Sequence, residues 1–274
     1  MLTTTIDGLW VLQVLTGIEV LGPELGLRPH LPRAETRESA LGLPIAEELR
    51  RCGLIDDAGR VDPPVAEWLT VAERRDIALV VNVVTPAPGP PARVLLARFA
   101  QWWVVLERCD DLVRIGPAGT STTLLGATAL IGEQIDRLCG RAEPAPLKPV
   151  TLPAEAVAGV RDTTAMRALL RSQGLDGEQI RLLSLASDPE KSAQAGVVAV
   201  QSGVDGGARA VVEAGAVTVL DTPEGRIVAE VVVRAGRRWL IAGPGTSRAI
   251  MAAVGAMLGR LPAESDWYSY RKVV

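Results

Sequence analysis

A short motif occurs near the end of each half of the sequence, and this repeat restricts the fold more than any other feature. Gly116-Pro117-Ala118-Gly119-Thr120-Ser121 precedes one apolar helical pattern, and Gly243-Pro244-Gly245-Thr246-Ser247 precedes another. Each pattern ends near an Arg-Leu pair, at Arg137-Leu138 and Arg260-Leu261. Two halves that end alike predict two related units in a pseudo-twofold arrangement.

Both halves also follow the same order of strand, helices, strands and terminal helix. In the first half, strands are expected at residues 2–5, 77–84, 94–99, 102–107 and 112–115, before a helix at 124–138. In the second, they are expected at 150–152, 195–202, 209–212, 217–221, 225–233 and 238–242, before a helix at 247–261. We predict an α+β fold in which two pseudo-twofold-related subdomains, residues 1–145 and 146–274, share a mostly antiparallel central β-sheet flanked by helical bundles.

The two Gly-rich turns raise the question of phosphate binding, because the free N–H groups of a helix N-terminus attract anions. A Walker loop needs a Lys before its Ser or Thr, and neither turn has one. Thr and Ser are good N-cap residues, so we interpret both turns as helix caps. The alternative is an enzyme that binds a phosphate or another small molecule at 116–121 and 243–247.

The residues that usually carry catalysis or bind metals are scarce. His30 is the only histidine, and it lies between Pro29 and Leu31 in an expected loop. Cys52, Cys109 and Cys139 are far apart and form no Cys-x-x-Cys. We therefore predict a protein that is not an enzyme and that has no catalytic residues, no metal site and no cofactor.

Charge and hydropathy restrict the partners. The net charge is −3 and Lys and Arg are dispersed, which argues against nucleic-acid binding. The longest apolar runs, 77–85 and 249–258, are shorter than the ~20 residues of a membrane span, so no membrane insertion is expected. The N-terminus lacks the features of a signal peptide, which predicts a cytoplasmic protein. Exposed strand edges would permit weak homodimers.

Two other segments are open to more than one interpretation. Pro86-Ala87-Pro88-Gly89-Pro90-Pro91 predicts a stiff loop between two strands, which is either a partner contact or a plain exposed loop. The tail Trp267-Tyr268-Ser269-Tyr270-Arg271 holds both tyrosines of the chain. We expect this tail to pack back on the core, with a contact site as the alternative.

Several uncommon short sequence motifs occur together in this chain, in a fixed order. They are Leu2-Thr3-Thr4-Thr5-Ile6-Asp7-Gly8-Leu9-Trp10, Glu24-Leu25-Gly26-Leu27-Arg28-Pro29, Trp102-Trp103-Val104-Val105-Leu106-Glu107-Arg108, Val113-Arg114-Ile115-Gly116-Pro117-Ala118-Gly119-Thr120 and the tail just described. With these motifs the chain resembles, over essentially its full length, the EspG family of mycobacterial ESX (type VII) secretion-associated proteins, in the branch of the second ESX system.

The resemblance implies a cytosolic chaperone. Such a protein binds cognate PE–PPE heterodimers through the apolar tip of the PPE protein, prevents their aggregation and supports type VII secretion. The resemblance also implies that the central sheet and the C-terminal helical bundle contact the partner, and that the loop between the second and third strands varies. A purely structural homodimer component is a third hypothesis, beside the chaperone and the small-molecule enzyme.

The predicted contact residues come from three segments. They are Pro88, Pro90 and Arg93 in and beside the Pro-rich loop, Met166, Leu169, Leu170, Ile180 and Leu183 in the helices of residues 164–186, and Arg226, Val228 and Glu230 on one face of the strand 225–233. The strand alternates, so one face can be covered by helices while the other meets a partner. For each apolar residue the alternative is a place in the core.

Overall fold

The computed structural model describes residues 1–29, 36–160, 162–202, 210–263 and 267. Within these residues, eleven strands form one sheet in the order β1-β5-β4-β3-β2-β7-β9-β10-β11-β6, with β8 beside β7. All ladders between these strands are antiparallel, which confirms the predicted type of sheet. The strands are β1 (Leu2–Thr5), β2 (Ile77–Val84), β3 (Ala92–Phe99), β4 (Trp102–Cys109), β5 (Leu112–Thr120), β6 (Val150–Pro153), β7 (Ala193–Gln201), β8 (Val211–Val212), β9 (Ala216–Thr222), β10 (Gly225–Arg234) and β11 (Arg237–Pro244).

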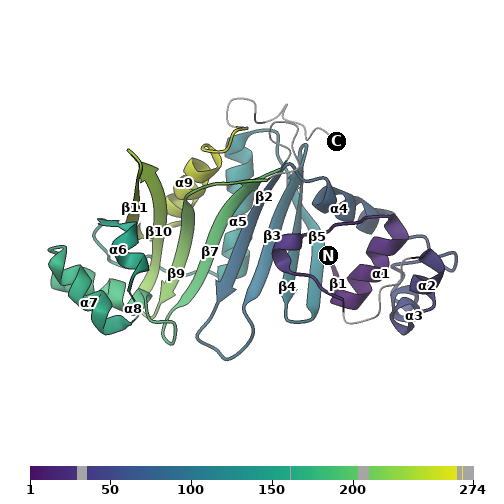
Figure 1. Ribbon diagram of the computed structural model, residues 1–274, viewed down its shortest axis with the longest axis horizontal. Helices are drawn as coiled ribbons and strands as arrows, with labels where there is room; N and C mark the ends of the chain where they lie inside the picture. The colour runs from purple at the N-terminus through teal and green to yellow at the C-terminus, as the bar shows by residue number, and fades with distance from the viewer. Residues whose placement is uncertain (30–35, 161, 203–209, 264–266, 268–274) are drawn as a thin grey trace.

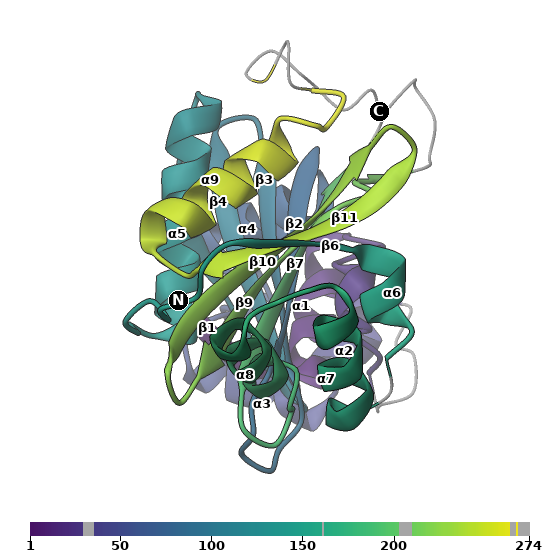
Figure 2. The same cartoon turned by 90° about the vertical axis from the view of Figure 1, so that its left-hand side faces the viewer.

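Helices cover both faces of this sheet. They are α1 (Ile6–Thr16), η1 (Pro23–Leu25, a 3₁₀ turn), α2 (Arg37–Leu41), α3 (Pro44–Arg51), α4 (Pro63–Glu73), α5 (Leu124–Cys139), α6 (Ala154–Ala158), α7 (Thr163–Ser172), α8 (Gly177–Ala186) and α9 (Ser247–Leu258). α5 and α9 lie side by side on one face, here called the back face (Figures 1 and 2). The front face carries α1–α4 at one end and α6–α8 at the other (Figure 1).

The two halves of the sheet are related by a pseudo-twofold axis, as predicted. β2 and β7 pair at the centre, where Val81 lies opposite Val197. Outward from this pair, the order β3, β4, β5, β1 on one side matches β9, β10, β11, β6 on the other. We call β1–β5 with their helices the N-terminal half and β6–β11 with theirs the C-terminal half. The predicted boundary between residues 145 and 146 lies in the connector from α5 to β6 and stays a prediction.

The repeated Gly-rich motif is partly strand and not a turn throughout. β5 continues to Thr120, and the helix cap is Thr123, whose Oγ1 accepts a hydrogen bond from the Gly126 N–H. In the second half the interpretation as a cap is correct, because Thr246 caps α9. Gly119 has a φ of +138°, and a Cβ there would lie 2.7 Å from the Leu130 side chain. A glycine therefore lets α5 pack closely on the strand.

Trp267 packs on the core, as expected for the start of the tail, while Tyr268 to Arg271 lie outside the described residues, as does His30. The Trp267 ring lies over the Arg98 guanidinium, 4.2 Å from the ring centroid, and Arg98 Nη1 donates to the Trp267 carbonyl at 3.0 Å. Arg98 also forms a two-point ion pair with Asp76, at 2.8 and 3.0 Å. Both side chains of this ion pair are 1% exposed.

Candidate functional site

The pseudo-twofold relation shows how the two halves differ on the front face. In the N-terminal half, one row of paired residues crosses the strands from β5 to β3; it consists of Ile115, Leu106 and Leu95. The equivalent row in the C-terminal half runs from β11 to β9 and consists of Ala242, Ala229 and Thr218. The second row therefore replaces three large apolar side chains with small ones.

The N-terminal half covers its row with its own chain. Leu25 of η1 is fully buried, and the turn at Gly22 lies against Leu95 and Leu106, so that a Cβ on Gly22 would lie 3.3 to 3.4 Å from their side chains. Leu21 and Ile18 are buried in the same cluster. Residues 17–26 thus act as an internal lid over this part of the sheet.

In the C-terminal half the equivalent position is an open groove. Its volume is about 290 Å³, and it lies between the sheet and the helices α6–α8. The floor consists of Leu152, Gln194, Thr218, Leu220, Ala229, Leu240 and Ala242, and the walls of Val157, Met166, Leu170, Leu183, Ala186 and Ser187. Among these described lining residues none is charged. The floor residues Thr218, Ala229 and Ala242 are small, and the segment between β6 and β7 is shorter than its equivalent between β1 and β2, which leaves the groove unfilled by described residues. We call it the client groove, after the partner that the sequence resemblance implies.

The wall formed by α8 is oriented by a capping box. The Asp176 carboxylate accepts from the Gln179 N–H at 2.9 Å, and the Gln179 side chain accepts from the Asp176 N–H at 3.0 Å. Lys148 Nζ donates to the same carboxylate at 3.1 Å. The Gln179 N–H and then Lys148 hold the pKa of the Asp176 carboxyl below its ordinary value of 3.8.

This lowered pKa predicts a pH dependence of the α8 wall. The stabilisation by Asp176 is complete above the ordinary pKa and is lost as the pH falls through the lowered folded value. The protection factors of the α8 amides, which correct the exchange rates for the intrinsic pH dependence of amide exchange, are expected to fall between pH 6 and pH 2.5 when followed by NMR. Asp176→Asn keeps an N-cap oxygen but does not titrate, so this acid-induced loss of protection should be absent from the variant. Equal pH profiles for the two proteins would contradict this prediction.

The helical contact residues predicted from sequence divide into two groups. Met166 and Leu170 on α7 and Leu183 on α8 line the client groove, where Leu170 is buried and the other two are half-buried. Leu169 and Ile180 are half-buried outside its lining. The first three residues therefore lie where a partner in the groove would meet them.

The strand residues predicted as contacts lie on the back face. Arg226 is 2% exposed and Val228 is buried under α5 and α9, while Glu230 is half-buried on the same side of β10. Ala229, on the opposite side of the strand, faces the groove. Alternation along β10 was predicted correctly, but the face assigned to the partner is the back face, which α5 and α9 cover. We therefore leave these three residues out of the proposed interface.

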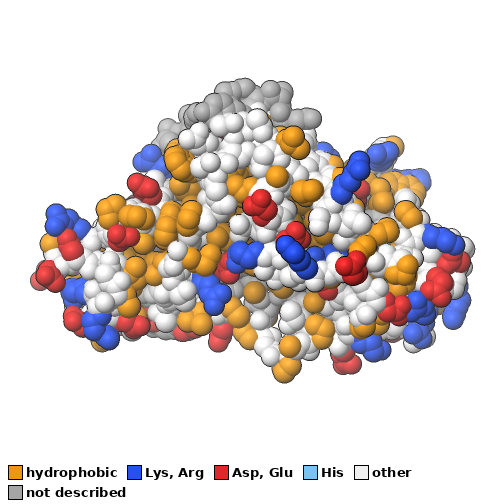
Figure 3. All heavy atoms as spheres, turned by 180° about the vertical axis from the view of Figure 1, so that it is seen from behind, with side chains coloured by type: hydrophobic (Ala, Val, Ile, Leu, Met, Phe, Trp, Pro, Cys, Tyr) orange, Lys and Arg blue, Asp and Glu red, His pale blue; other side chains and the backbone are white. Residues whose placement is uncertain are grey.

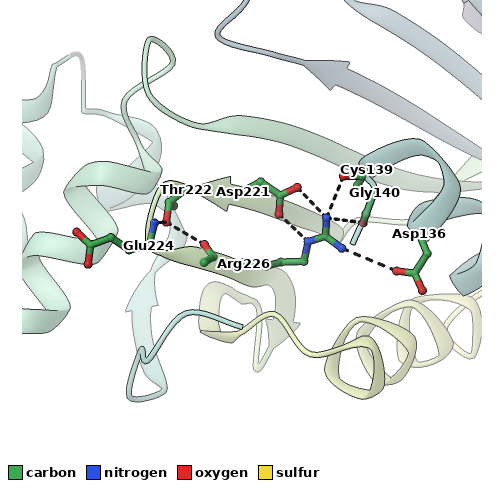
Figure 4. Close-up of polar contacts among 8 residues, drawn as sticks. Asp136, Cys139, Gly140, Asp221, Thr222, Glu224 and Arg226 are labelled. Atoms are coloured by element: carbon green, nitrogen blue, oxygen red, sulfur yellow. Dashed lines mark hydrogen bonds and ion pairs between the residues drawn. The ribbon is translucent and has the colours of Figure 1, made fainter. Parts of the chain in front are cut away.

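Arg226 instead joins α5 to the C-terminal half (Figure 4). Its Nε and Nη2 bind the Asp221 carboxylate at 2.6 and 2.7 Å, and Nη2 also donates to the carbonyls of Cys139 and Gly140 at the end of α5. Asp136 lies 3.8 Å from Nη1. The side chain thus satisfies the last carbonyls of a helix, which is a structural role.

The thiols beside and away from this cluster are expected to differ in reactivity. Burial raises the pKa of Cys139 to about 11 despite the nearby Arg226 charge, whereas Cys52 and Cys109 are exposed. At pH 8 roughly a thousandth of Cys139 is then thiolate, the reactive form. Titration with a thiol reagent should show two fast groups and one slow one, and Cys139→Ser should remove only the slow phase. Three equally fast thiols would contradict this assignment.

The predicted loop residues are not part of the groove lining. Pro88 and Pro90 are exposed between β2 and β3. Arg93 is exposed on β3, with its guanidinium beside Gly26 of the N-terminal half. A role for these residues in binding stays a prediction.

Sequence reasoning missed the groove floor. Thr218, Ala229 and Ala242 carry no signal of their own, because small residues in strands are common. Their small size becomes informative only when each residue is compared with its equivalent in the other half. That comparison requires the strand pairing, which the sequence does not give.

The alternative site at the Gly-rich turns has little free backbone. The Gly245 N–H donates to the Arg226 carbonyl at 2.7 Å, and the Thr246 N–H donates to the Pro244 carbonyl. Among the described residues, no cluster of His, Cys, Asp and Glu could hold a metal, and no helix is long and apolar enough to cross a membrane. On the described part of the back face, Lys and Arg side chains are interspersed with Asp and Glu, and no large area has one sign (Figure 3).

Comparisons with known proteins agree with the fold. The sequence model of the EspG family matches residues 5–256. The chain is 50% identical, over 100% of both chains, to the ESX-2 secretion-associated protein EspG2 of Mycobacterium tuberculosis H37Rv. It is 29% identical to the ESX-3 secretion-associated protein EspG3 of Mycolicibacterium smegmatis, over 96% of this chain and 88% of that protein. A solved structure of the Mycobacterium tuberculosis type VII secretion system chaperone EspG5, in complex with a PE25–PPE41 dimer, matches with a TM-score of 0.75 at 23% identity, over 95% of this chain and 96% of that one.

Proposed function

The chain belongs to the EspG family of secretion-associated proteins, and from this premise we propose that it is a cytosolic chaperone for a PE–PPE heterodimer. The client groove receives the apolar tip of the PPE protein and keeps the heterodimer from aggregating before type VII secretion. The proposal includes no catalytic step. Two findings support the proposal. The chain belongs to a family of secretion-associated proteins. A protein of the same fold, the chaperone EspG5, has been solved in complex with a PE25–PPE41 dimer.

The observation that carries the proposal is the difference between the halves. Each half builds an equivalent front-face row, and in the N-terminal half Leu21 and Leu25 pack in the cluster that covers it. In the C-terminal half Ala229 and Ala242 pack against α8, but the described residues leave a groove of about 290 Å³ beside them. The C-terminal groove is the position where another protein can supply such side chains. Burying a Leu-sized side chain contributes about 1.5–3 kcal/mol, so two or three of them would make a substantial part of a specific interaction.

The lining also explains a preference for an apolar, uncharged tip. A charged side chain placed in this groove would lose its water without gaining an ion pair, because the described lining residues carry no charge. Gln194, Thr218 and Ser187 supply a few hydrogen-bonding groups that can orient the tip. Met166 on the wall is flexible enough to adapt to clients of different shape.

The direct test is co-purification. The chain is expressed with PE–PPE pairs of its source organism, one pair at a time, and each mixture is separated by size exclusion with mass measurement. A ternary complex is expected, with the PE–PPE pair more soluble than when expressed alone. Separate elution of the chain and a soluble pair would reject the client assignment.

A further inference from the structure

A second cavity, of about 550 Å³, lies on the N-terminal half between α4 and the adjoining ends of β4 and β5. It is lined by Ala66, Glu67, Trp68, Thr70, Val71, Trp102, Trp103, Val104, Pro117, Gly119 and Thr120. Two tryptophans are accessible there, because Trp102 is 52% exposed and Trp68 is half-buried. Glu67, the charged member of the lining, is exposed. We call this cavity the tryptophan cleft.

The equivalent position in the C-terminal half is filled by the connector between α5 and β6. Val104 and Pro117 form a strand pair that corresponds to the pair of Ile227 and Pro244. Next to that second pair, the connector forms an isolated parallel bridge with β10: the Ala145 N–H donates to the Arg226 carbonyl at 2.8 Å, and the Arg226 N–H donates to the Glu143 carbonyl at 2.7 Å.

The segment that fills this position is rich in proline. It reads Glu143-Pro144-Ala145-Pro146-Leu147-Lys148-Pro149. Ala145 and Leu147 are buried in one cluster with Ile227 and with Leu182 of α8. Lys148 follows the apolar residues and pairs with the Asp176 carboxylate at the start of α8. This half therefore shows an extended, proline-rich strip between a helix and the sheet, with a basic residue paired to an acidic one beside that helix.

In the N-terminal half no described segment crosses the equivalent position, so the cleft is open. A segment bound in this cleft would also make contacts of a different kind from those that the connector makes in the C-terminal half. At Gly225 a Cβ would lie 2.7 Å from the Ala145 backbone nitrogen, so the C-terminal half needs a glycine where the connector passes. The equivalent residue in β4 is Trp102, and β5 continues to pair with Trp103 through Gly119. The backbone of β4 is thus already paired with β5, so a bound segment would contact the indole ring of Trp102 and not the strand backbone.

We propose that the tryptophan cleft binds a proline-rich segment of a partner protein in the polyproline II conformation. Grooves lined by aromatic side chains suit such segments, because the polyproline II helix is preformed and loses little entropy on binding. Trp68 and Trp102 supply the stacking surfaces. Glu67 pairs with a Lys or Arg next to the prolines, as Asp176 pairs with Lys148. The cleft is separate from the client groove and is a second interaction site.

The test uses the full-length chain labelled with 5-fluorotryptophan, whose six tryptophans give separate ¹⁹F signals assigned by substitution. The probe is a synthetic peptide with the sequence of residues 143–149, blocked at both ends. We expect saturable shifts of the Trp68 and Trp102 signals. A peptide in which Ala replaces the three prolines should bind at least tenfold more weakly. Trp102→Ala should weaken binding of the proline-rich peptide at least tenfold while the Tm stays near that of the wild type.

Two further variants sharpen the test. Glu67→Gln should weaken binding about two- to threefold, as expected for an exposed ion pair, and this loss should vanish at high salt. Val233→Ala removes an apolar side chain that is 45% exposed near the end of β10, in the C-terminal half, and should leave the affinity unchanged.

Three results would overturn the proposal. The first is the absence of shifts at millimolar peptide, and the second is equal binding of the peptide without prolines. The third is a cleft already occupied by this chain itself. If a second copy occupies the cleft, the Trp68 and Trp102 signals shift with protein concentration in the absence of peptide. If the chain's own end occupies it, these signals shift when residues 268–274 are deleted. In both cases the signals would not respond to the peptide.

Discussion

Replacing Arg98 with Met is expected to lower the free energy of unfolding by about 3–5 kcal/mol. The reason is that Asp76, which is 1% exposed, would keep a buried carboxylate without its two-point partner. Of the donors described around this carboxylate, only the Ile77 N–H would remain. The Trp267 carbonyl and ring would lose Arg98 as well. A loss of this size is a large share of the 5–15 kcal/mol that stabilises a typical domain.

Urea denaturation and thermal unfolding would measure this effect, with a Tm lower by roughly 10 °C. The double variant Arg98→Met/Asp76→Leu removes both charges and should recover much of the loss, because an apolar pair can replace a buried ion pair. Arg60→Met is the matched control, since its ion pair with Asp56 is exposed and should change stability by less than about 1 kcal/mol. A double variant as unstable as Arg98→Met would show that packing, and not the unpaired charge, dominates.

The double variant Thr218→Leu/Ala229→Leu is expected to weaken client binding at least a hundredfold, or about 2.7 kcal/mol. These substitutions place in the client groove the leucines that the equivalent positions, Leu95 and Leu106, carry in the N-terminal half. The new side chains would fill space that the PPE tip is proposed to occupy. Stability should stay the same or increase, because they bury apolar surface in an existing cavity.

Binding is measured by titration of the purified PE–PPE pair, and stability by thermal unfolding. Ala129→Leu adds the same side chain to an exposed position on α5 and should affect neither quantity. Wild-type affinity in a double variant that folds normally would exclude the client groove as the binding site. A lowered Tm would instead indicate overpacking, and Ala229→Leu alone would then be the informative variant.

The local pattern of the sequence was sufficient for the elements and for their grouping into halves. Val-rich runs with alternation predicted β2, β7 and β10, and the two Gly-Pro motifs identified β5 with α5 and β11 with α9 as equivalent units. Such features depend only on residues that are close in the sequence, so they can be recognised without a structure. For the same reason the helical wall of the groove was partly predicted, through Met166, Leu170 and Leu183.

The conformation of the repeated Gly-Pro motif could be predicted only in part from the local sequence. Thr246 caps α9 as its position suggests, but Gly116 to Thr120 belong to β5 because they pair with β4. Hydrogen bonds between strands outweighed the turn preference of Gly and Pro at that place. Both motifs begin in a strand, because Gly243 and Pro244 pair with β10 as Gly116 and Pro117 pair with β4. They differ only after the proline, where β11 ends and β5 continues to Thr120.

The choice between the two faces of β10 could not be made from the sequence. Arg226 and Val228 alternate with Ile227 and Ala229, and either set could face solvent. The back face is covered by α5 and α9, which are distant in sequence and meet only after the halves have paired. The groove, too, exists because the lid of residues 17–26 has no counterpart among the described residues over Thr218, Ala229 and Ala242. The sequence determined two similar halves, and tertiary structure decided which of them keeps its apolar face open, because that outcome depends on contacts between segments far apart in the chain.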